Sequence, residues 1–471
     1  MNKWKLTQII NLINPKQIIN VSNEETFDYL KIVDLNKVKY ENQAKNVLFF
    51  FTYSTDKDLT DEFIINPFDL RTKSSNIIKN NPNYTYVIDE QTYNNLGEEK
   101  LNTKFIIVEN ILDSINALYD YIIKKNKAKV IAVTGSVGKT TAVGLIESVI
   151  HQKYQVLRIY SKRITPIILK ANIINFVTPT IEYIVLEMSI YHRDHVEILS
   201  DILKPDIAAL IGVDSSHLEY FNSIDDICKY KSSIFRYAEY GYYNNLDGRV
   251  KQLSVKDNQL YWQQENIYNT KLKALEPIVD NYVLSNSEII INNLHLKLFF
   301  NTQLSVVQTL LAYKIGKLLS IKDEDIEFAI NNYTPVENRI CQKVAFGKQI
   351  IFDGDITTNE RIKQLANHKY DESYLVIRKF GSAENNKRFN YVLDSLDKFT
   401  KVFIFDDIEY LNMLSKHPKT EIVNSHNFMK DLTGQIIYHY SGYYRSFDEY
   451  NENNLIKLEN ERYKILKPKE E

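Results

Sequence analysis

Short apolar segments of strand length alternate with longer segments of helical length through the middle of the chain. The apolar segments lie at residues 130–135, 154–161, 181–189 and 206–213. Strands that are buried on both faces read as nearly continuous apolar runs, and the segments between them supply the helical crossovers of a parallel sheet. The pattern therefore predicts an α/β protein whose central part is a doubly wound, mostly parallel sheet.

Two further α/β segments flank this central part. Before it, residues 46–53 and 104–110 read as strands and residues 114–127 as a helix, which predicts a small N-terminal α/β domain. After a proline-containing pause at 334–338, four apolar segments predict the strands of a third α/β unit: 349–354, 372–380, 401–407 and 435–440. We place the domains at residues 1–125, 126–335 and 336–471. No internal repeat is visible in the sequence.

Length and composition fit several globular domains. The 471 residues are 44% hydrophobic and 25% charged, which is enough for more than one buried core. A formal net charge of −2 and the lack of a basic segment with interleaved aromatic residues argue against nucleic acid and anionic lipid as partners. The two cysteines cannot build a disulfide framework, and neither a signal peptide nor a membrane-spanning apolar run is recognisable. We expect a cytoplasmic protein.

The first candidate site is the sequence TGSVGKTT at 134–141, which joins an apolar strand to a helix. Glycines let successive backbone N–H groups turn inward, lysine offers a positive charge to phosphate, and a threonine hydroxyl can ligate Mg²⁺. The spacing is a variant of the usual loop, because Val133 stands where the first glycine is expected. A glycine-rich turn without a ligand is the alternative. The predicted phosphate-binding residues are Gly135, Ser136, Val137, Gly138, Lys139, Thr140 and Thr141.

Other candidates follow the carboxyl ends of the next strands, where an open α/β sheet binds its ligands. Glu187 closes the third strand, His217 follows the fourth, and Lys231 lies on the helix after it. With Thr140, the carboxylate and imidazole could bind Mg²⁺ that bridges the phosphates of ATP. Each residue alone has a plainer interpretation, as a capping glutamate, a structural histidine or a lysine on a solvated helix face.

Four separated motifs resemble the Mur ligases, ATP-dependent enzymes that add amino acids or dipeptides to peptidoglycan precursors. The motifs are TGSVGKTT, VLEM, HLEYFNS and PVENR, in this order. The similarity is greatest to the branch that adds D-alanyl-D-alanine, and it extends over roughly residues 128–445. It implies a P-loop ATPase domain in the centre, a Rossmann-like C-terminal domain and an N-terminal domain that binds the acceptor.

The resemblance also implies residue roles. Residues 135–141 would hold the triphosphate of ATP. Mg²⁺ would be bound by Thr140, Glu187 and His217, and by Lys231 after carbamylation, since an unmodified lysine repels a cation. Lys229 is the alternative if the register differs. Further nucleotide-binding residues implied by the resemblance are Asn301, Arg339 and Asp353, while Lys139, His217 and Lys231 would act in catalysis.

The reaction implied is formation of an amide bond. A substrate carboxylate attacks the γ-phosphorus of ATP to give an acyl phosphate and ADP, and an amine then displaces phosphate. The expected partners are a small carboxylate acceptor, with a UDP-linked muramyl peptide as one candidate, and an amino acid or dipeptide. A monomer is expected, although no sequence pattern decides the oligomeric state.

The sequence departs from the family outside the nucleotide motifs. Ile211-Gly212 replaces the usual Thr-Asn, residues 354–359 replace Asp-Ser-Tyr-Asn-Ala-Asn, and residues 439–445 replace Lys-Gly-Ser-Arg. The N-terminal segment also lacks the pattern that handles the uridine-linked sugar. Two alternatives therefore stay open: a ligase that builds poly-amino-acid chains on another acceptor, and a non-catalytic paralogue that binds ATP.

Overall fold

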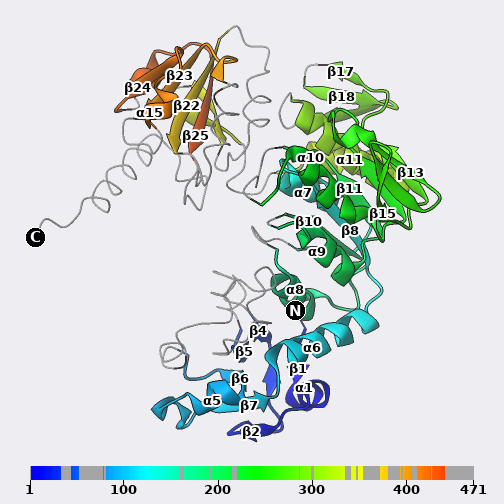
Figure 1. Ribbon diagram of the computed structural model, residues 1–471, viewed down its shortest axis with the longest axis vertical. Coiled ribbons are helices and arrows are strands. Elements are labelled where there is room, and N and C mark those ends of the chain that lie inside the picture. Colours follow the sequence, from blue (N-terminus) through cyan, green and yellow to red (C-terminus); the bar gives the residue numbers. More distant parts are fainter. Residues whose placement is uncertain are drawn as a thin grey trace, which may run out of the picture.

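The computed structural model confirms the predicted α/β class and contains a separate sheet in each of three successive parts of the chain (Figure 1). In the part that the structure describes, no helix is long and apolar enough to cross a membrane. The described residues are 2–32, 44–51, 78, 81–159, 164–190, 192–214, 220–285, 287–298, 302–334, 341–345, 348–353, 372–379, 393, 396–405, 411–425 and 427–440.

The N-terminal sheet has the order β2-β7-β6-β5-β4, in which β2 is antiparallel to β7 and the other pairs are parallel. A separate antiparallel pair is formed by β1 and β3. The elements are β1 (Trp4–Lys5), α1 (Leu6–Ile13), β2 (Gln17–Ile19), β3 (Thr26–Phe27), β4 (Tyr29–Lys31), β5 (Val47–Phe50), β6 (Thr85–Asp89), α5 (Glu90–Asn94), the 3₁₀ turn η2 (Glu98–Lys100), β7 (Lys104–Val108) and α6 (Ile111–Lys125).

The central sheet is parallel throughout, with the order β16-β12-β11-β8-β10-β9. From β8 near the middle the chain runs to the edge strand β9, returns to β10, and then crosses β8 to β11, β12 and β16, so strands lie on both sides of β8 as the doubly wound prediction requires. The elements are β8 (Lys129–Thr134), α7 (Lys139–Ile150), β9 (Val156–Ile159), α8 (Pro166–Phe176), β10 (Tyr183–Met188), α9 (His195–Leu203), β11 (Ile207–Leu210), α10 (Ile224–Lys231), η3 (Ser232–Phe235), β12 (Tyr240–Tyr243), β16 (Ala274–Pro277), α11 (Gln303–Leu318) and α12 (Asp323–Asn331).

Alternate residues of β8 face two different cores, because successive side chains of a strand point to opposite faces. Ile131 and Val133 join the core formed with α7, α11 and α12. Val130 and Ala132 join the larger core that contains α8, α9 and the N-terminal helices. Both faces of the sheet are therefore covered, and the edge at the carboxyl ends of the strands is left for ligands.

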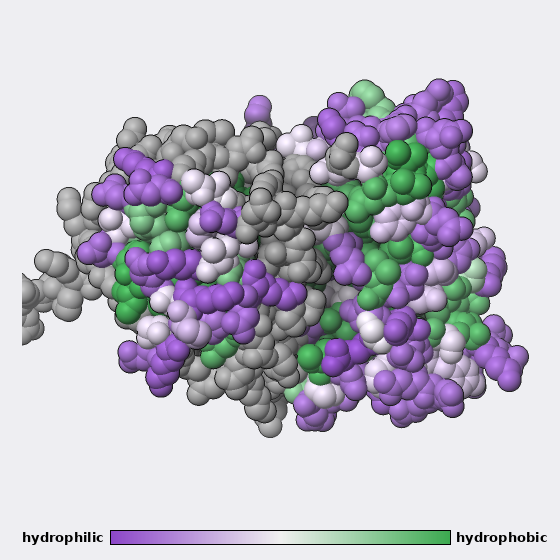
Figure 2. Space-filling view, turned by 90° about the horizontal axis from the view of Figure 1, so that it is seen from above, coloured by the Kyte–Doolittle hydropathy of each residue, from purple (hydrophilic) through white to green (hydrophobic). Residues whose placement is uncertain are grey.

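Two small antiparallel sheets interrupt the central part, and the strand-helix alternation did not anticipate them. One has the order β13-β14-β15 and the other β17-β18-β19. Val283 and Leu284 of β17 are exposed, and the view from this end shows apolar residues among mostly polar ones (Figure 2). The elements are η4 (Val250–Gln252), β13 (Leu253–Lys256), β14 (Gln259–Trp262), β15 (Glu265–Asn269), β17 (Val283–Ser285), β18 (Glu288–Ile291) and β19 (Leu294–Lys297).

The C-terminal sheet has the order β20-β21-β25-β22-β23-β24 and contains all four predicted strands. Only β20 is antiparallel to its neighbour in this sheet. The mostly parallel order fits the predicted Rossmann-like unit. The elements are β20 (Cys341–Ala345), β21 (Lys348–Asp353), β22 (Ser373–Lys379), β23 (Lys401–Phe405), α15 (Leu411–Leu414), β24 (Thr420–Val423), η5 (Asn427–Lys430) and β25 (Gln435–Tyr440).

Asn175, near the end of α8, ties the central part to the N-terminal sheet. Its side chain donates to the carbonyl of Leu30 in β4 at 2.9 Å and accepts from the amide of Leu30 at 2.9 Å. Its backbone carbonyl accepts from the amide of Asn2 at 2.8 Å. Asn175 is 1% exposed, so these bonds are made away from solvent and fix β4 against α8.

Candidate active site

The loop between β8 and α7 is shaped for glycine. Gly138 caps the start of α7 with φ +83°, a left-handed conformation that other residues rarely adopt. A Cβ at this position would lie 2.5 Å from Gln308 Nε2 and 2.8 Å from Leu304 Cδ1, so a larger residue also lacks space. The backbone can therefore turn closely into α7 at this one point.

Hydrogen bonds fix the loop against the segment that follows β11. The Ser136 amide donates to the carbonyl of Gly212 at 2.9 Å, and the Asp214 amide donates to Ser136 Oγ at 2.9 Å. A Cβ on Gly135 would lie 2.7 Å from Ile211 Cγ1. The Ile211-Gly212 pair, where the sequence departs from the Mur family, thus lies directly against the loop.

The start of α7 offers both a helix dipole and a cation. The N-cap residue of α7 is Gly138, which has no side chain that could cap the first turn. Lys139 opens the helix, and its ammonium group donates to the carbonyls of Gly135 at 2.8 Å and Ser136 at 3.3 Å. A helix N-terminus with an adjoining lysine is a favourable site for phosphate.

Thr140 and Glu187 form a buried oxygen pair beside the loop. Thr140 Oγ1 donates to Glu187 Oε2 at 2.6 Å, and the two residues are 5% and 4% exposed. The pair forms because β10 lies next to β8 with Glu187 opposite Val133. A hydroxyl and a carboxylate are the hard oxygen ligands that Mg²⁺ prefers, so the donor set fits this ion. Among the described residues, no group of three or more His, Cys, Asp or Glu is arranged to hold a metal.

Lys231 reaches the same loop from α10. It is 1% exposed, and its Nζ donates to the Gly135 carbonyl at 3.1 Å. Burial holds the pKa of Lys231 well below its usual range, and the nearby Lys139 ammonium lowers this pKa further. Lys139 and Lys231 therefore bring two amines to one carbonyl oxygen.

The side chain of Lys229 contacts residues outside the phosphate loop. Its Nζ pairs with Glu265 Oε2 at 2.6 Å and lies 5.2 Å from the ring centroid of Trp262. These contacts keep Lys229 away from the Gly135 carbonyl, and hydrogen bonding to Glu265 raises its pKa. Of the two lysines on α10 that the sequence offered, Lys231 is the one that the structure brings to the loop.

Two further residues at the loop were not selected from the sequence. Gln308, in α11, is 4% exposed and donates to the Gly138 carbonyl at 2.9 Å. Arg158, in β9, donates to the Thr140 carbonyl at 2.9 Å and pairs with Glu147 at 3.2 Å. Gln308 is a polar residue within an apolar helical segment, and that interruption is the signal that could have identified it.

Of the remaining sequence candidates, only some lie within the described residues. Val137 and Thr141 lie in the loop and the first turn of α7. Asp353 is the last residue of β21, and its side chain is outside the description. His217, Asn301 and Arg339 fall outside the described residues.

Comparisons with known proteins agree with this geometry. Residues 133–287 match the Mur ligase middle domain. The chain is 29% identical to the UDP-N-acetylmuramoyl-tripeptide–D-alanyl-D-alanine ligase of Rickettsia prowazekii over 162 residues, which cover 32% of this chain and 36% of the relative. The chain thus spans about a third of the length of this curated relative.

Solved structures show the same overall fold. The structure of MurF from Acinetobacter baumannii has a TM-score of 0.68 with 13% identity, and covers 98% of this chain and 99% of that chain. The MurF ligase of Thermotoga maritima in complex with ADP has a TM-score of 0.63 with 16% identity, and covers 89% of this chain and 96% of that chain. Residues 133–287 therefore resemble the Mur ligase middle domain, and the chain shares the overall fold of the solved MurF structures.

Proposed function

We propose that this chain, which has a Mur ligase middle domain, is an ATP-dependent ligase that joins a carboxylate to an amine with release of ADP and phosphate. One observation carries the proposal. Lys139 and the buried Lys231 both donate to the Gly135 carbonyl, and Thr140, the residue after Lys139, donates to the buried carboxylate of Glu187. A site that only bound ATP would not need the buried amine of Lys231 beside the loop.

The role proposed for each residue follows from the chemical group that it offers to phosphate or to metal. Residues 135–141 hold the phosphates through backbone amides and Lys139, and Asn301, Arg339 and Asp353 complete the nucleotide site in this proposal. The Thr140 hydroxyl, Glu187 and His217 would hold Mg²⁺, which would supply positive charge that offsets the charge of the phosphates. The short Thr140–Glu187 contact supports a shared role for these two oxygens.

Carbamylation of Lys231 is part of the same proposal. Carbon dioxide adds to a neutral amine but not to an ammonium ion, and burial lowers the pKa of Lys231 toward the neutral form. The product is a carboxylate that could ligate a second cation. It would also remove the like-charge contact between Lys231 and Lys139 around the Gly135 carbonyl.

The chemistry has two steps. An oxygen of the acceptor carboxylate attacks the γ-phosphorus, which forms an acyl phosphate and breaks the bond to the β-phosphate, so that ADP leaves. The amine then attacks the acyl carbon, loses a proton and displaces inorganic phosphate, which gives the amide. Lys139 stabilises the charge that develops on the transferred phosphoryl group, and the helix dipole of α7 acts in the same direction.

The substrate classes are proposed from the relatives. The named activity of the Rickettsia relative joins D-alanyl-D-alanine to a UDP-linked muramoyl tripeptide. We propose a small carboxylate acceptor of this kind, with a UDP-linked muramyl peptide as the first candidate, and an amino acid or dipeptide as the amine. Such substrates are cytoplasmic metabolites, which supports a cytoplasmic location. The division at residues 1–125, 126–335 and 336–471 is also proposed, and the presence of a separate large sheet in each segment supports it.

The test is phosphate release from Mg²⁺-ATP by the purified chain, with a panel of UDP-linked muramyl peptides and candidate amines. Release that requires both an acceptor and an amine, together with a product heavier by one amide-linked unit, is expected. A product extended repeatedly would instead indicate a ligase of the poly-amino-acid type. Binding of ATP without release for any pair would favour the non-catalytic alternative.

A further inference from the structure

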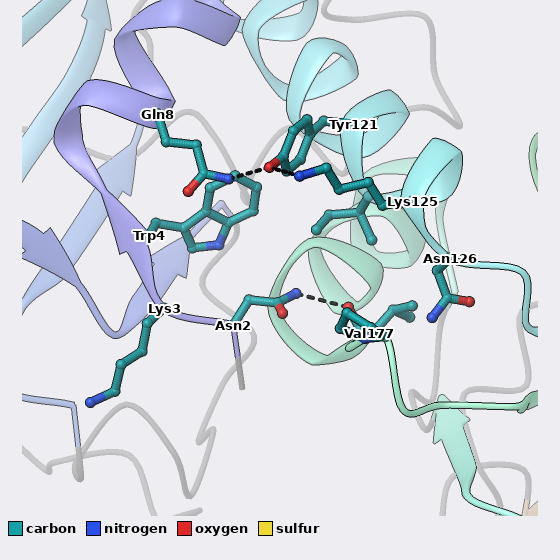
Figure 3. Close-up of a pocket in the computed structure, with 10 residues that line it drawn as sticks. Asn2, Lys3, Trp4, Gln8, Tyr121, Lys125, Asn126 and Val177 are labelled. Atoms are coloured by element: carbon teal, nitrogen blue, oxygen red, sulfur yellow. Dashed lines mark hydrogen bonds between the residues drawn. The ribbon is translucent and has the colours of Figure 1, made fainter.

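A cavity at the junction between the N-terminal and central parts takes no part in the proposed reaction. Its volume is about 170 Å³. The lining comes from the first eight residues, from the end of α6 and from the segment that follows α8 (Figure 3). No residue of the phosphate loop lines the cavity, so a ligand here would not compete with ATP for that loop.

Trp4 gives the cavity a buried donor. The residue is 1% exposed, and its indole Nε1–H has no hydrogen-bond partner among the described residues. The indole nitrogen lies on the side of the ring that faces Asn2, another lining residue (Figure 3). Buried donors are nearly always paired in proteins, so the arrangement suits a ligand that brings an acceptor.

Tyr121 and Lys125 add a second donor and a positive charge. The Tyr121 hydroxyl oxygen accepts from Gln8 Nε2 at 2.7 Å and from Lys125 Nζ, so its own O–H remains to donate. The Lys125 ammonium lies 4.1 Å from the Tyr121 ring centroid. No Asp or Glu lines the cavity. The polar side of the cavity therefore favours an anion with two acceptor oxygens.

The other walls are apolar. Ile122 and Val177 are buried and line the cavity, and the Trp4 and Tyr121 rings lie 5.9 Å apart with a tilt of 48°. A cavity of about 150 Å³ with an apolar lining is large enough for one six-membered ring. The space thus suits a body of ring size attached to the anionic group.

We propose that this junction cavity binds a small organic monocarboxylate with a planar apolar body. Its carboxylate accepts from Trp4 Nε1 and from the Tyr121 hydroxyl beside Lys125, and its apolar part packs against Ile122 and Val177. The site does not depend on ligase activity. Because its walls come from two parts of the chain, a bound ligand also holds these parts together.

The probe is benzoate, and the reporter is Trp4 itself. The chain has two tryptophans, so Trp262→Phe leaves Trp4 as the single indole fluorophore. Titration is expected to change the Trp4 emission in a saturable way. Benzyl alcohol has the same ring without the charge, and should bind roughly tenfold more weakly. If Trp262→Phe does not fold, calorimetric titration of the unchanged protein gives the same comparison.

Two variants test the assignment of the donors. Lys125→Met should weaken benzoate binding roughly tenfold and leave benzyl alcohol unaffected, whereas Lys127→Met, an exposed neighbour outside the cavity, should change neither. Trp4→Phe should abolish the rise in unfolding temperature that benzoate produces in the unchanged protein. Absence of saturable benzoate binding, or equal binding of benzoate and benzyl alcohol, would overturn the proposal.

Discussion

At the scale of single residues, the Gly135 carbonyl is the point where the loop meets two amines. Lys139 and Lys231 both donate to it, at 2.8 Å and 3.1 Å. Only Lys139 lies at the start of a helix, where its ammonium group can contact a bound phosphate. The two lysines therefore have different tasks, and single substitutions should separate them.

Lys139→Met should remove phosphoryl-transfer activity while the protein stays folded. The substitution keeps the aliphatic length of the side chain but deletes the charge that, in the proposed mechanism, stabilises the transferred group. We expect phosphate release to fall by roughly 100-fold or more, as when a donor to a developing oxyanion is lost. Exposed Lys127→Met is the matched control and should retain activity. Unimpaired turnover by Lys139→Met would contradict the proposed role.

Glu187→Gln should affect the metal more than the fold. Glutamine can still accept from Thr140 Oγ1, which now lies 2.6 Å from the carboxylate, but it brings no negative charge. The Mg²⁺ concentration needed for half-maximal ATP binding should rise roughly tenfold or more, measured by calorimetry at fixed ATP. Glu182→Gln, at the exposed residue just before the same strand, should leave this concentration unchanged. A similar shift in both variants would argue against a magnesium ligand at Glu187.

The sequence alone could predict the candidate site residues that lie close together along the chain. Gly138, Lys139 and Thr140 could be predicted because a strand, a loop and a helix N-terminus are contiguous in the sequence. Gln308 could not, because its contact with Gly138 joins residues 170 positions apart and depends on how α11 packs on α7. Contacts of this kind are decided by tertiary packing and not by local pattern.

At the scale of elements, the backbone conformation at the start of α7 requires Gly138, and side chains of α11 fill the space beside this residue. Gly138→Ala places a Cβ in a left-handed conformation and 2.5 Å from Gln308 Nε2. We expect a loss of about 1–3 kcal/mol in the free energy of unfolding, together with weaker ATP binding. Urea denaturation and nucleotide titration measure the two effects.

Gly248→Ala is the control for this substitution. A Cβ on Gly248 would have no heavy atom within 4 Å, and its φ is not positive. The free energy of unfolding of the Gly248→Ala variant should therefore differ from that of the unchanged protein by less than about 0.5 kcal/mol. Equal losses in the two variants would mean that the restricted space around Gly138 does not matter for stability.

The junction between α8 and β4 gives a second prediction for an element. Asn175→Ala removes the side chain that pairs both backbone groups of Leu30, and it leaves these groups buried. The free energy of unfolding should fall by about 2–4 kcal/mol, because two buried polar groups lose their partner. Asn172→Ala is the control, since Asn172 bonds only within its own helix among the contacts seen here, and should cost less than about 0.5 kcal/mol. A loss of less than about 0.5 kcal/mol for Asn175→Ala would mean that the bonds between Asn175 and Leu30 do not stabilise the contact of α8 with β4.

The predicted elements differ from the observed ones in an informative way. The four apolar segments of the central part became β8, β9, β10 and β11, because buried parallel strands have a strong sequence pattern. The small sheets of β13–β15 and β17–β19 did not follow from the pattern, since their strands mix exposed and buried residues and lack a continuous apolar run. Short half-exposed hairpins resemble loops in composition.

At the scale of the whole molecule, the succession of α/β units along the chain was easier to predict than the contacts between these units. Three α/β units in succession follow from alternating apolar segments, and each has its own sheet. The cavity at the junction could not be predicted, because it needs Trp4, Tyr121 and Val177, which are far apart in sequence. Only packing of α6 against α1 and α8 brings these residues together.

The charge on Lys231 links the active site to the stability of the whole molecule. In the unfolded chain this lysine titrates near its ordinary pKa of 10.5, whereas burial and Lys139 lower its pKa in the folded protein. Between these two pKa values the unfolded state binds more protons than the folded state. The free energy of unfolding should therefore rise with pH across this interval and level off above about 10.5.

Lys231→Met removes this dependence, because methionine does not titrate and fits an apolar site. In buffer free of carbon dioxide the variant should be more stable than the unchanged protein at pH 7, and the difference should shrink toward pH 9 by at most about 1.4 kcal/mol for each pH unit. Lys229→Met is the control, since the raised pKa of half-buried Lys229 makes stability depend on pH only above about 10.5. Urea denaturation at several pH values measures the differences. A stability difference between Lys231→Met and the unchanged protein that stays constant or grows with pH would mean that Lys231 is buried with its proton, and the neutral amine required for carbamylation would then be lacking.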